Sequence, residues 1–258
     1  MSNVSISTNK LAIGYGEAVV QTDLSFSLYE GEMVCMLGPN GCGKSTLLRT
    51  LAGLQPALAG ESKVESRKSK VESQKAIALV LTERLSLENT TVHDVVAMGR
   101  YPYTSFLGGL TDEDEAIIAQ SLQQVGFPPS HQGEGRGGAT SFFNAHSDGE
   151  KQRILIAKAL AQQTPIILLD EPTAHLDLPH RILVLRLLRQ LAHEQGKTIL
   201  ISTHELDLAL ALSDRILLMS PKAQGVQLDT SENLKKADAF TSAFGMDIFN
   251  PLGLPRMT

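Results

Sequence analysis

The amino-acid sequence predicts an α/β fold in which a parallel β-sheet carries helices on both of its faces. Three short apolar runs are typical of buried strands, and each precedes a stretch whose apolar residues recur at helical spacing. These runs span Glu32–Leu37, Pro165–Leu169 and Thr198–Ser202. Because strands that alternate with helices are joined by crossover connections, the pattern indicates a parallel sheet.

The residues around this core form two further regions. The expected core helices span Lys44–Gly53, Pro179–Gln195 and Glu205–Leu212. Ahead of the first core strand, Val4–Ile13 and Asp23–Leu28 alternate apolar and polar residues, which is typical of an antiparallel sheet with one exposed face. The middle of the chain, from Thr91 to Leu160, has mostly helical patterning. The sequence therefore predicts an N-terminal antiparallel β subdomain and an inserted α-helical subdomain.

The length and charge of the chain exclude several classes of function. Its 258 residues suffice for one large domain or two small ones. There are 23 Lys and Arg residues against 28 Asp and Glu, and a net charge of −5 does not favour binding to nucleic acid or to anionic lipid. The longest apolar run is Ala76–Leu81, far shorter than the roughly 20 residues of a membrane-spanning helix.

The N-terminus and the cysteines favour a cytosolic protein. Residues 1–7 have neither the basic flank nor the apolar stretch of a secretory signal, so we expect the chain to stay in the cytosol. The two cysteines, Cys35 and Cys42, form no Cys-x-x-Cys pair and have no histidine at metal-ligand spacing. We therefore expect neither a disulfide framework nor a zinc site.

Two segments are expected to lie outside the packed core. Ser62–Lys68 (SKVESRK) and Ser69–Lys75 (SKVESQK) are tandem copies that differ at one position. Each copy has a single valine, which is too few apolar residues for the seam of a coiled coil, so we expect a solvated excursion or an exposed hairpin. The glycine-rich segment Gln132–Ala145 is expected to be a loop.

The strongest chemical motif lies between the first core strand and its helix. Residues 38–45 match G-x-x-x-x-G-K-[ST] in full, in the strand–loop–helix context that this motif requires. The glycines let consecutive backbone N–H groups converge on phosphate oxygens, Lys44 is placed to reach the β- and γ-phosphates, and Ser45 is placed to bind Mg²⁺. The motif predicts a P-loop NTPase with a nucleotide site made of Gly38, Pro39, Asn40, Gly41, Cys42, Gly43, Lys44, Ser45 and Thr46. We also expect the loop dipoles to favour the Cys42 thiolate, so that Mg-ATP protects it from maleimide.

Two later strands end in residues that complete the chemistry of a nucleoside triphosphatase. The apolar run that begins at Ile166 ends in Asp170 and Glu171. Asp170 is placed to hold Mg²⁺, and Glu171 is placed to act as the general base. The strand Thr198–Ser202 is followed by His204, and phosphates bind at the carboxyl ends of parallel strands. We therefore expect His204 to contact the γ-phosphate.

The order of these motifs resembles that of the ATP-binding cassette (ABC) ATPases over nearly the whole chain. The resemblance implies a RecA-like core with ATP and Mg²⁺ as cofactors, and it implies that Tyr15 stacks on adenine. It also places Asp177 in the family segment Ala174-His175-Leu176-Asp177, which follows the acidic pair Asp170 and Glu171.

The family signature, Leu-Ser-Gly-Gly-Gln, aligns with residues 146–150. The resemblance implies that Ser147 and Gly149 contact the γ-phosphate of an ATP molecule held by a second, head-to-tail copy. Ser147 and Glu150 also have the spacing of a capping box at the start of a helix.

The sequence departs from this family at two places. His146 and Asp148 replace signature residues, and Asp148 adds a negative charge near phosphate. Thr82 stands where family members have a glutamine that senses Mg²⁺ and contacts the membrane partner. Because threonine is shorter than glutamine, either Glu83 substitutes for it or the contact runs through water.

The resemblance implies one cassette. Residues 1–82 and 159–258 would form the catalytic core with the β subdomain, and residues 83–158 the helical subdomain with the signature. The segment Thr91–Tyr103 resembles that of importers for iron-siderophore, haem and cobalamin chelates. This implies a homodimer bound to integral membrane permease subunits at the cytoplasmic face of the inner membrane, indirectly linked to a substrate-binding protein and without a nucleic-acid partner.

Two other functions stay open from the sequence. One is a soluble ABC ATPase of the repair or translation type, and the other is a weakly hydrolysing, nucleotide-dependent regulator. Members of the repair type carry a long coiled coil and members of the translation type carry two cassettes, whereas this sequence has neither feature.

Overall fold

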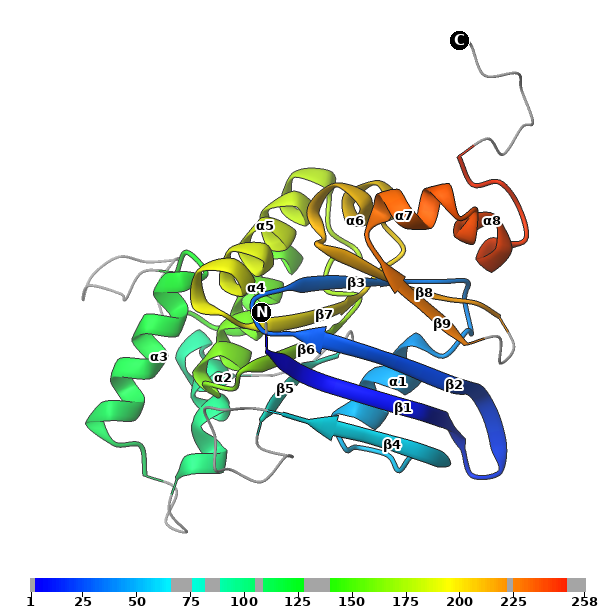
Figure 1. The fold of residues 1–258 in the computed structure, drawn as a ribbon. Coiled ribbons are helices and arrows are strands. Elements are labelled where there is room, and N and C mark those ends of the chain that lie inside the picture. Colours follow the sequence, from blue (N-terminus) through cyan, green and yellow to red (C-terminus); the bar gives the residue numbers. More distant parts are fainter. Residues whose placement is uncertain are drawn as a thin grey trace.

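Two β-sheets and a group of helices make up the protein in this computed structural model, which describes residues 3–65, 76–81, 89–104, 109–127, 140–221 and 225–249. One sheet has three antiparallel strands in the order β2-β1-β4, and the other has six strands in the order β5-β6-β7-β3-β8-β9. Figure 1 shows the three-stranded sheet on one side of the six-stranded sheet, α5 and α6 on the other side, and α2, α3 and α4 at one end.

The six-stranded sheet forms the centre of the protein. Its strands are β3 (Met33–Leu37), β5 (Ile77–Val80), β6 (Ile166–Asp170), β7 (Thr198–Ser202), β8 (Arg215–Met219) and β9 (Val226–Asp229), of which only β9 is antiparallel to its neighbour. All residues of β3, β6 and β7 are buried, because packed layers cover both faces of the sheet. Cys35 faces the core under α4 and α5, whereas Val34 and Met36 face the antiparallel sheet. The predicted α/β core is confirmed.

The antiparallel sheet consists of β1 (Val4–Tyr15), β2 (Ala18–Tyr29) and β4 (Ala59–Val64). Its inward-facing residues, among them Ile13 and Leu24, are fully buried and share a core with α1. The alternating pattern of the sequence therefore predicted this sheet correctly.

The first tandem copy begins inside this sheet. Ser62 and Lys63 pair with Thr8 and Ser7 of β1, and β4 ends at Val64. The sequence analysis expected a solvated excursion or an exposed hairpin. The side chains of these residues are exposed as expected, but their main chain is an edge strand of the antiparallel sheet. Main-chain hydrogen bonds to β1 form the strand, while the side chains of β4 stay largely exposed, so the polar sequence carried no strand signal. Residues 66–75 of the copies lie outside the described residues.

The helical region has the mostly helical character that the sequence predicts. It comprises α2 (Val92–Ala97), the 3₁₀ helix η2 (Met98–Tyr103), α3 (Asp112–Gln124), the 3₁₀ helix η3 (Phe143–Ala145) and α4 (Asp148–Ala161). At Gly99, a Cβ atom would lie 2.3 Å from the carbonyl oxygen of Lys158, so only glycine lets η2 approach α4 this closely. Helix α4 is continuous across residue 158, where the expected boundary between subdomains falls. Residues 132–139 of the glycine-rich segment lie outside the described residues.

The core helices α1 (Lys44–Leu51), α5 (Leu178–Gln195) and α6 (Leu206–Leu212) follow β3, β6 and β7, as predicted. Helix α5 ends at Gly196, whose φ of 67° is left-handed. The structure adds β8, β9, α7 (Ser231–Lys236) and α8 (Ala239–Phe244), which the sequence analysis did not place. Within the described ranges, no helix combines the length and the apolarity needed to cross a membrane.

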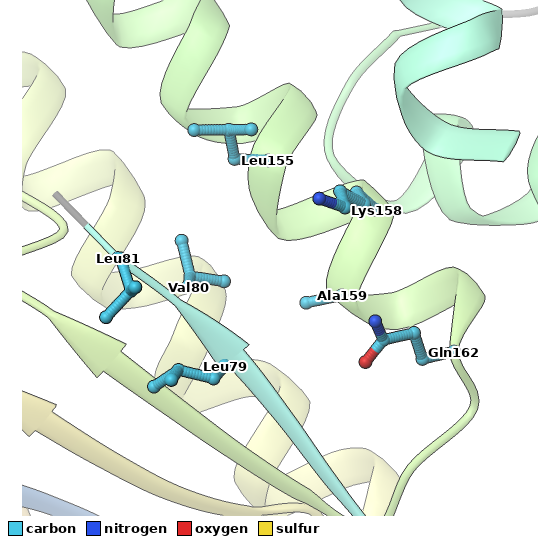
Figure 2. A pocket seen from close by; sticks show the side chains of 7 residues that line it. All are labelled: Leu79, Val80, Leu81, Leu155, Lys158, Ala159 and Gln162. Carbon is cyan, nitrogen blue, oxygen red and sulfur yellow. The ribbon is translucent and has the colours of Figure 1, made fainter. Parts of the chain in front are cut away.

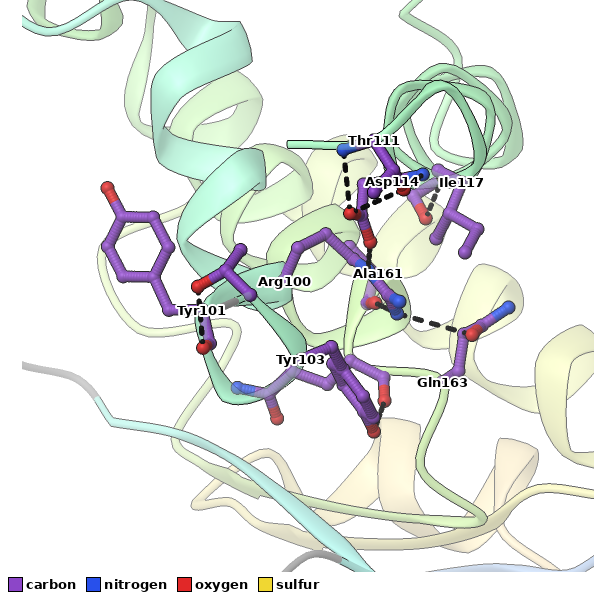
Figure 3. A network of polar contacts seen from close by, with 11 residues as sticks. Arg100, Tyr101, Tyr103, Thr111, Asp114, Ile117, Ala161 and Gln163 are labelled. Atoms are coloured by element: carbon purple, nitrogen blue, oxygen red, sulfur yellow. Dashed lines mark hydrogen bonds and ion pairs between the residues drawn. The ribbon is translucent and has the colours of Figure 1, made fainter. Parts of the chain in front are cut away.

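A buried ion pair joins three helices of the helical region (Figure 3). The side chains of Arg100 and Asp114 are each 7% exposed, and Arg100 Nε donates to Asp114 Oδ1 over 2.7 Å. Arg100 Nη1 also donates to the carbonyl oxygen of Ala161 at the end of α4, over 2.9 Å. The guanidinium group lies 4.2 Å from the centre of the Tyr103 ring. One side chain therefore connects η2, α3 and α4.

This pair also makes part of the stability depend on pH. Hydrogen bonds from the main chain of Thr111 and from Arg100 lower the pKa of Asp114 to about 2, from an ordinary value of 3.8. The pKa of Asp114 is lower in the folded state than in the unfolded chain. The ionised Asp114 carboxylate therefore contributes fully to the stability of the fold above the ordinary pKa of 3.8, and this contribution is lost as the pH falls toward 2.

Removal of the arginine tests this role. We expect Arg100→Ala to lower the free energy of unfolding by about 3 kcal/mol, because its buried partner loses its counter-charge. As a control, Lys63→Ala breaks an exposed pair with Glu61 and should change that free energy by less than about 0.5 kcal/mol. Urea unfolding followed by circular dichroism measures the free energy of unfolding of both variants. An equal decrease in the two variants would contradict the stabilising role of the buried Arg100 pair.

Candidate functional site

The candidate site lies at one edge of the six-stranded sheet. Strands β6, β7 and β3 are neighbours in parallel register, with Asp170 opposite Ser202 and Met36 opposite Ser202. Their carboxyl ends therefore meet at the same edge, where ligands bind in open α/β sheets. This arrangement brings together the loop after β3, the two acids at the end of β6 and His204 after β7.

The loop after β3 is shaped by two left-handed glycines. Gly41 has φ 76° and Gly43, which directly precedes α1, has φ 101°. A Cβ atom on Gly43 would lie 2.8 Å from Val20 Cγ1 of β2, so space as well as backbone angle requires glycine. Lys44, only 6% exposed, donates from Nζ to the carbonyl oxygens of Gly38 (2.9 Å) and Pro39 (3.2 Å). The ammonium group is thereby held across the loop.

Cys42 does not have the environment that the sequence analysis expected. It is 4% exposed, belongs to the core under the antiparallel sheet, and its Sγ would lie 2.8 Å from a Cβ atom on Gly38. Burial raises the pKa of the Cys42 thiol despite the opposing effect of Lys44. The expected thiolate is therefore wrong: the side chain points away from the rim of the loop, and desolvation outweighs the dipoles.

Gln21 is a supporting residue that the sequence analysis missed. This fully buried side chain of β2 donates from Nε2 to the carbonyl oxygens of Cys42 (3.0 Å) and Ser220 (2.6 Å). It ties the loop to the residue that follows β8. The sequence carried no signal for this role, because Gln21 lies outside the predicted strand Asp23–Leu28 and its partners are distant in sequence.

Tyr15 stands beside the loop at the end of β1. Its ring is 53% exposed, and its hydroxyl oxygen accepts a hydrogen bond from Thr46 Oγ1 over 3.1 Å. The structure thus places an accessible aromatic face next to the first turn of α1.

Ser202 links the two acids at the end of β6. Its hydroxyl donates to Asp170 Oδ1 over 2.5 Å and accepts from the Glu171 N–H over 2.9 Å. Glu171 N also donates to the Ser202 carbonyl oxygen over 3.1 Å. These bonds hold Glu171 in a left-handed conformation, φ 47°, that is unfavourable for a residue with a side chain. The sequence analysis missed Ser202, although a polar residue ending a buried apolar strand was a usable signal.

Glu171 and His204 are in direct contact. Glu171 Oε1 lies 2.7 Å from His204 Nε2, and both side chains are partly exposed, at 34% and 43%. The adjacent strands β6 and β7 therefore place a carboxylate and an imidazole next to each other at the sheet edge. A solvent-accessible pair of this kind can accept, hold and pass on a proton.

Asp177 begins helix α5. Its carboxylate accepts from the His180 N–H over 3.2 Å and bonds His180 Nδ1, and the latter contact is the main cause that lowers the pKa of Asp177. The His180 ring in turn packs on Gly149, where a Cβ atom would lie 3.0 Å from His180 Cδ2.

The signature residues lie at the start of α4. Ser147 is the N-cap, and reciprocal bonds with Glu150 confirm the predicted capping box. In the described part of the chain, the hydrogen bonds of Ser147 go to Glu150 and Lys151 of its own helix and not to the loop after β3. Within one chain the structure thus does not join Ser147 and Gly149 to that loop. Thr82 and Glu83 lie outside the described residues.

Comparison with known proteins identifies the family. The ABC transporter family matches residues 21–174, which is more than half of the chain. The chain belongs to the ABC transporter family. It is therefore an ATP-binding cassette that hydrolyses ATP. The iron(3+)-hydroxamate import ATP-binding protein of Bacillus subtilis is 36% identical over 94% of this chain and 88% of its own.

Solved ABC structures have the same fold. One, described as a metal-chelate type ABC transporter in an inward-facing conformation, superposes with a TM-score of 0.81 at 30% identity, over 94% of this chain and 90% of that one. Another, a dimeric bacterial ABC transporter cassette, has a TM-score of 0.69 at 26% identity, over 87% of this chain and 98% of that one. The expected α/β cassette with an antiparallel sheet and a helical region is confirmed.

Ser202→Ala tests how the acids of this cassette are positioned. The variant removes the hydroxyl that orients Asp170 and Glu171, so we expect kcat for ATP hydrolysis to fall about tenfold while KM for ATP changes less. Ser242→Ala, an exposed serine on α8, is the matched control and should keep the wild-type rate. A Ser202→Ala enzyme with unchanged kcat would show that the hydroxyl does not position the acids.

Proposed function

We propose that this chain is the ATP-hydrolysing subunit of a membrane importer for metal chelates of the iron-siderophore, haem or cobalamin type. The observation that carries the proposal is the meeting of the P-loop, the acidic pair and His204 at one sheet edge, in a cassette whose relative is named for iron(3+)-hydroxamate import. The similarity to a metal-chelate type transporter supports the same substrate class.

In this proposal the loop and the sheet edge bind ATP with Mg²⁺. Backbone N–H groups of residues 40–46 and the Lys44 ammonium hold the phosphates, and Tyr15 stacks on adenine. The Ser45 hydroxyl and the Asp170 carboxylate are the hard oxygen ligands that Mg²⁺ prefers, and few protein ligands suffice because phosphate and water supply the rest. Bound Mg²⁺ would offset the charge on the phosphates.

The same proposal gives the Glu171 and His204 pair the chemical step. Glu171 takes the proton of the attacking water as general base. His204 Nε2 carries a single proton, so it holds Glu171 before nucleotide binds and turns to stabilise charge on the γ-phosphate when ATP is bound. Their 2.7 Å contact lets the carboxylate be held in place before water attacks. Asp177 would lie at the edge of this arrangement, next to the start of α5.

A second copy would complete each site. Ser147 and the N–H groups near Gly149 lie at the N-terminus of α4, a 14-residue helix whose dipole favours an anion. Because they do not reach the loop of their own chain, we propose that they contact the γ-phosphate bound by a head-to-tail partner, as in a homodimer. The dimeric cassette that this chain resembles supports that assembly.

The permease would dock beside β5. A cavity of about 160 Å³ separates Leu79, Val80 and Leu81 from Leu155 and Lys158 of α4 (Figure 2). The lining residue Leu81 directly precedes Thr82 in the sequence, and Tyr101 of η2 is 60% exposed. Docking there would keep the chain peripheral at the cytoplasmic face of the membrane. Thr82 or Glu83 would contact the permease, which in turn meets a substrate-binding protein.

The general base is tested by Glu171→Gln. We expect kcat to fall about 1000-fold while ATP binding is retained, and ATP to trap a stable dimer, because the amide cannot accept the proton of water. Phosphate release and size-exclusion chromatography measure the two effects. Glu232→Gln, on the exposed face of α7, is the control. Hydrolysis by Glu171→Gln at the wild-type rate would exclude Glu171 as the base.

The transport role is tested by purifying the tagged chain from membranes. We expect two integral membrane permease subunits to co-purify, and mass spectrometry to identify them. ATPase activity of the complex should rise with the cognate binding protein and its metal chelate. Recovery of the chain from the soluble fraction alone would favour a soluble ABC ATPase or a nucleotide-dependent regulator.

A further inference from the structure

Arg181 joins two segments of the candidate site that follow different strands. It lies near the start of α5, and its Nε donates to the carbonyl oxygen of Leu176, just before that helix, over 2.6 Å. Its Nη1 donates to Glu205 Oε1 over 2.5 Å, and Glu205 directly follows His204. One guanidinium group therefore connects the segment that leaves β6 with the segment that leaves β7.

The segment between Glu171 and α5 has a backbone that needs such support. Glu171 and His175 both have left-handed conformations, with φ of 47° and 65°. Residues with side chains keep these conformations only where surrounding contacts hold them. The Ser202 hydroxyl holds Glu171 at the start of the segment, and Arg181 holds the Leu176 carbonyl group at its end.

The segment that carries His204 is held on both sides. Before it, the Thr203 N–H donates to the carbonyl oxygen of Met36 in β3 over 3.1 Å. After it, Glu205 is the N-cap of α6, yet in the described structure its carboxylate bonds Arg181 and makes no capping hydrogen bond to that helix. The main chain around His204 is thus tied to β3 on one side and to α5 on the other.

We propose that Arg181 is a positioning residue for ATP hydrolysis, which acts through Glu205 on His204. This inference rests on the roles that the proposed function gives to Glu171 and His204. The contacts close a ring, because Glu171 touches His204 over 2.7 Å and Arg181 joins the segments that follow these two residues. A closed ring limits independent movement of the carboxylate and the imidazole, which must keep their geometry for water to be attacked productively.

The pair holds the main chain beside His204 and leaves its ring free. The imidazole can therefore turn from Glu171 to the γ-phosphate without loss of the Arg181 contact. Arg181 and Glu205 are each 30% exposed, and an ion pair with this access to water contributes little to stability. We expect Arg181→Ala to lower the unfolding temperature by less than about 4 °C, so that a loss of activity does not arise from a loss of fold.

The first measurement is ATP hydrolysis by the full chain with Arg181→Ala, with Glu205→Ala and with both changes. We expect each single variant to lower kcat about tenfold while KM for ATP changes less than about twofold, because misplaced groups slow the chemical step without weakening ATP binding. The double variant should also lose about tenfold, since two residues that act as one pair are not additive. Arg186→Ala, an exposed arginine of the same helix, is the matched control and should keep the wild-type rate.

The second measurement follows His204 itself by NMR of the nucleotide-free protein with ¹⁵N-labelled histidine. The His204 Nε2 signal is assigned by its disappearance in His204→Ala. We expect Arg181→Ala to shift this signal, because the imidazole no longer keeps its place against Glu171. Arg186→Ala should leave the signal where it is.

These results separate the inference from the proposed function. Unchanged kcat or an unchanged His204 signal in Arg181→Ala would overturn the inference and leave the proposed function intact. A hundredfold loss in the double variant would show that the two residues act independently, and would overturn the inference as well. Wild-type hydrolysis by both Glu171→Gln and His204→Ala would overturn the proposed function and the inference together.

Discussion

The parallel pairing of β6, β7 and β3 is the constraint on which the site depends. Each strand is buried along its whole length, so its register is fixed by packing on both faces and cannot slip without exposing apolar side chains. Fixed register places the carboxyl ends together. The loop that follows β3, the acids that end β6 and the histidine that follows β7 converge because their strands are neighbours, although they are up to 166 positions apart in the chain (Gly38 to His204).

Hydrogen bonds at this sheet edge hold in place the groups that the strand register brings together. Ser202, opposite Asp170 in the ladder, bonds the Asp170 carboxylate and the Glu171 N–H, and so holds the side chain of the first acid and the main chain of the second. Gln21 bonds the carbonyl oxygens of Cys42 in the loop and of Ser220 after β8, and the Lys44 ammonium bonds the carbonyl oxygen of Gly38. Buried side chains thus hold the loop and the acids that would contact nucleotide, so that the site is preorganised by the core rather than by the loop alone.

The helical region is held by a different kind of interaction. Three capping boxes, begun by Thr91, Thr111 and Ser147, start its helices, and the buried Arg100 joins η2, α3 and α4. At α4, one capping box is both a structural device and the proposed trans half-site. The His146 imidazole beneath it shows how a residue that departs from the family pattern can still be well accommodated, since burial against Phe127 and two polar partners replace the packing of leucine.

The sequence by itself determined the α/β class, the strands β3, β6 and β7 with the helices that follow them, the P-loop and the acidic pair, because these depend on local periodicity and on contiguous motifs. Tertiary structure decided what depends on distant partners. It buried the Cys42 thiol, recruited Gln21 and Ser202, and paired the start of the polar tandem copy with β1. Desolvation and cross-strand hydrogen bonds are properties of neighbours in space, and a linear pattern does not contain them.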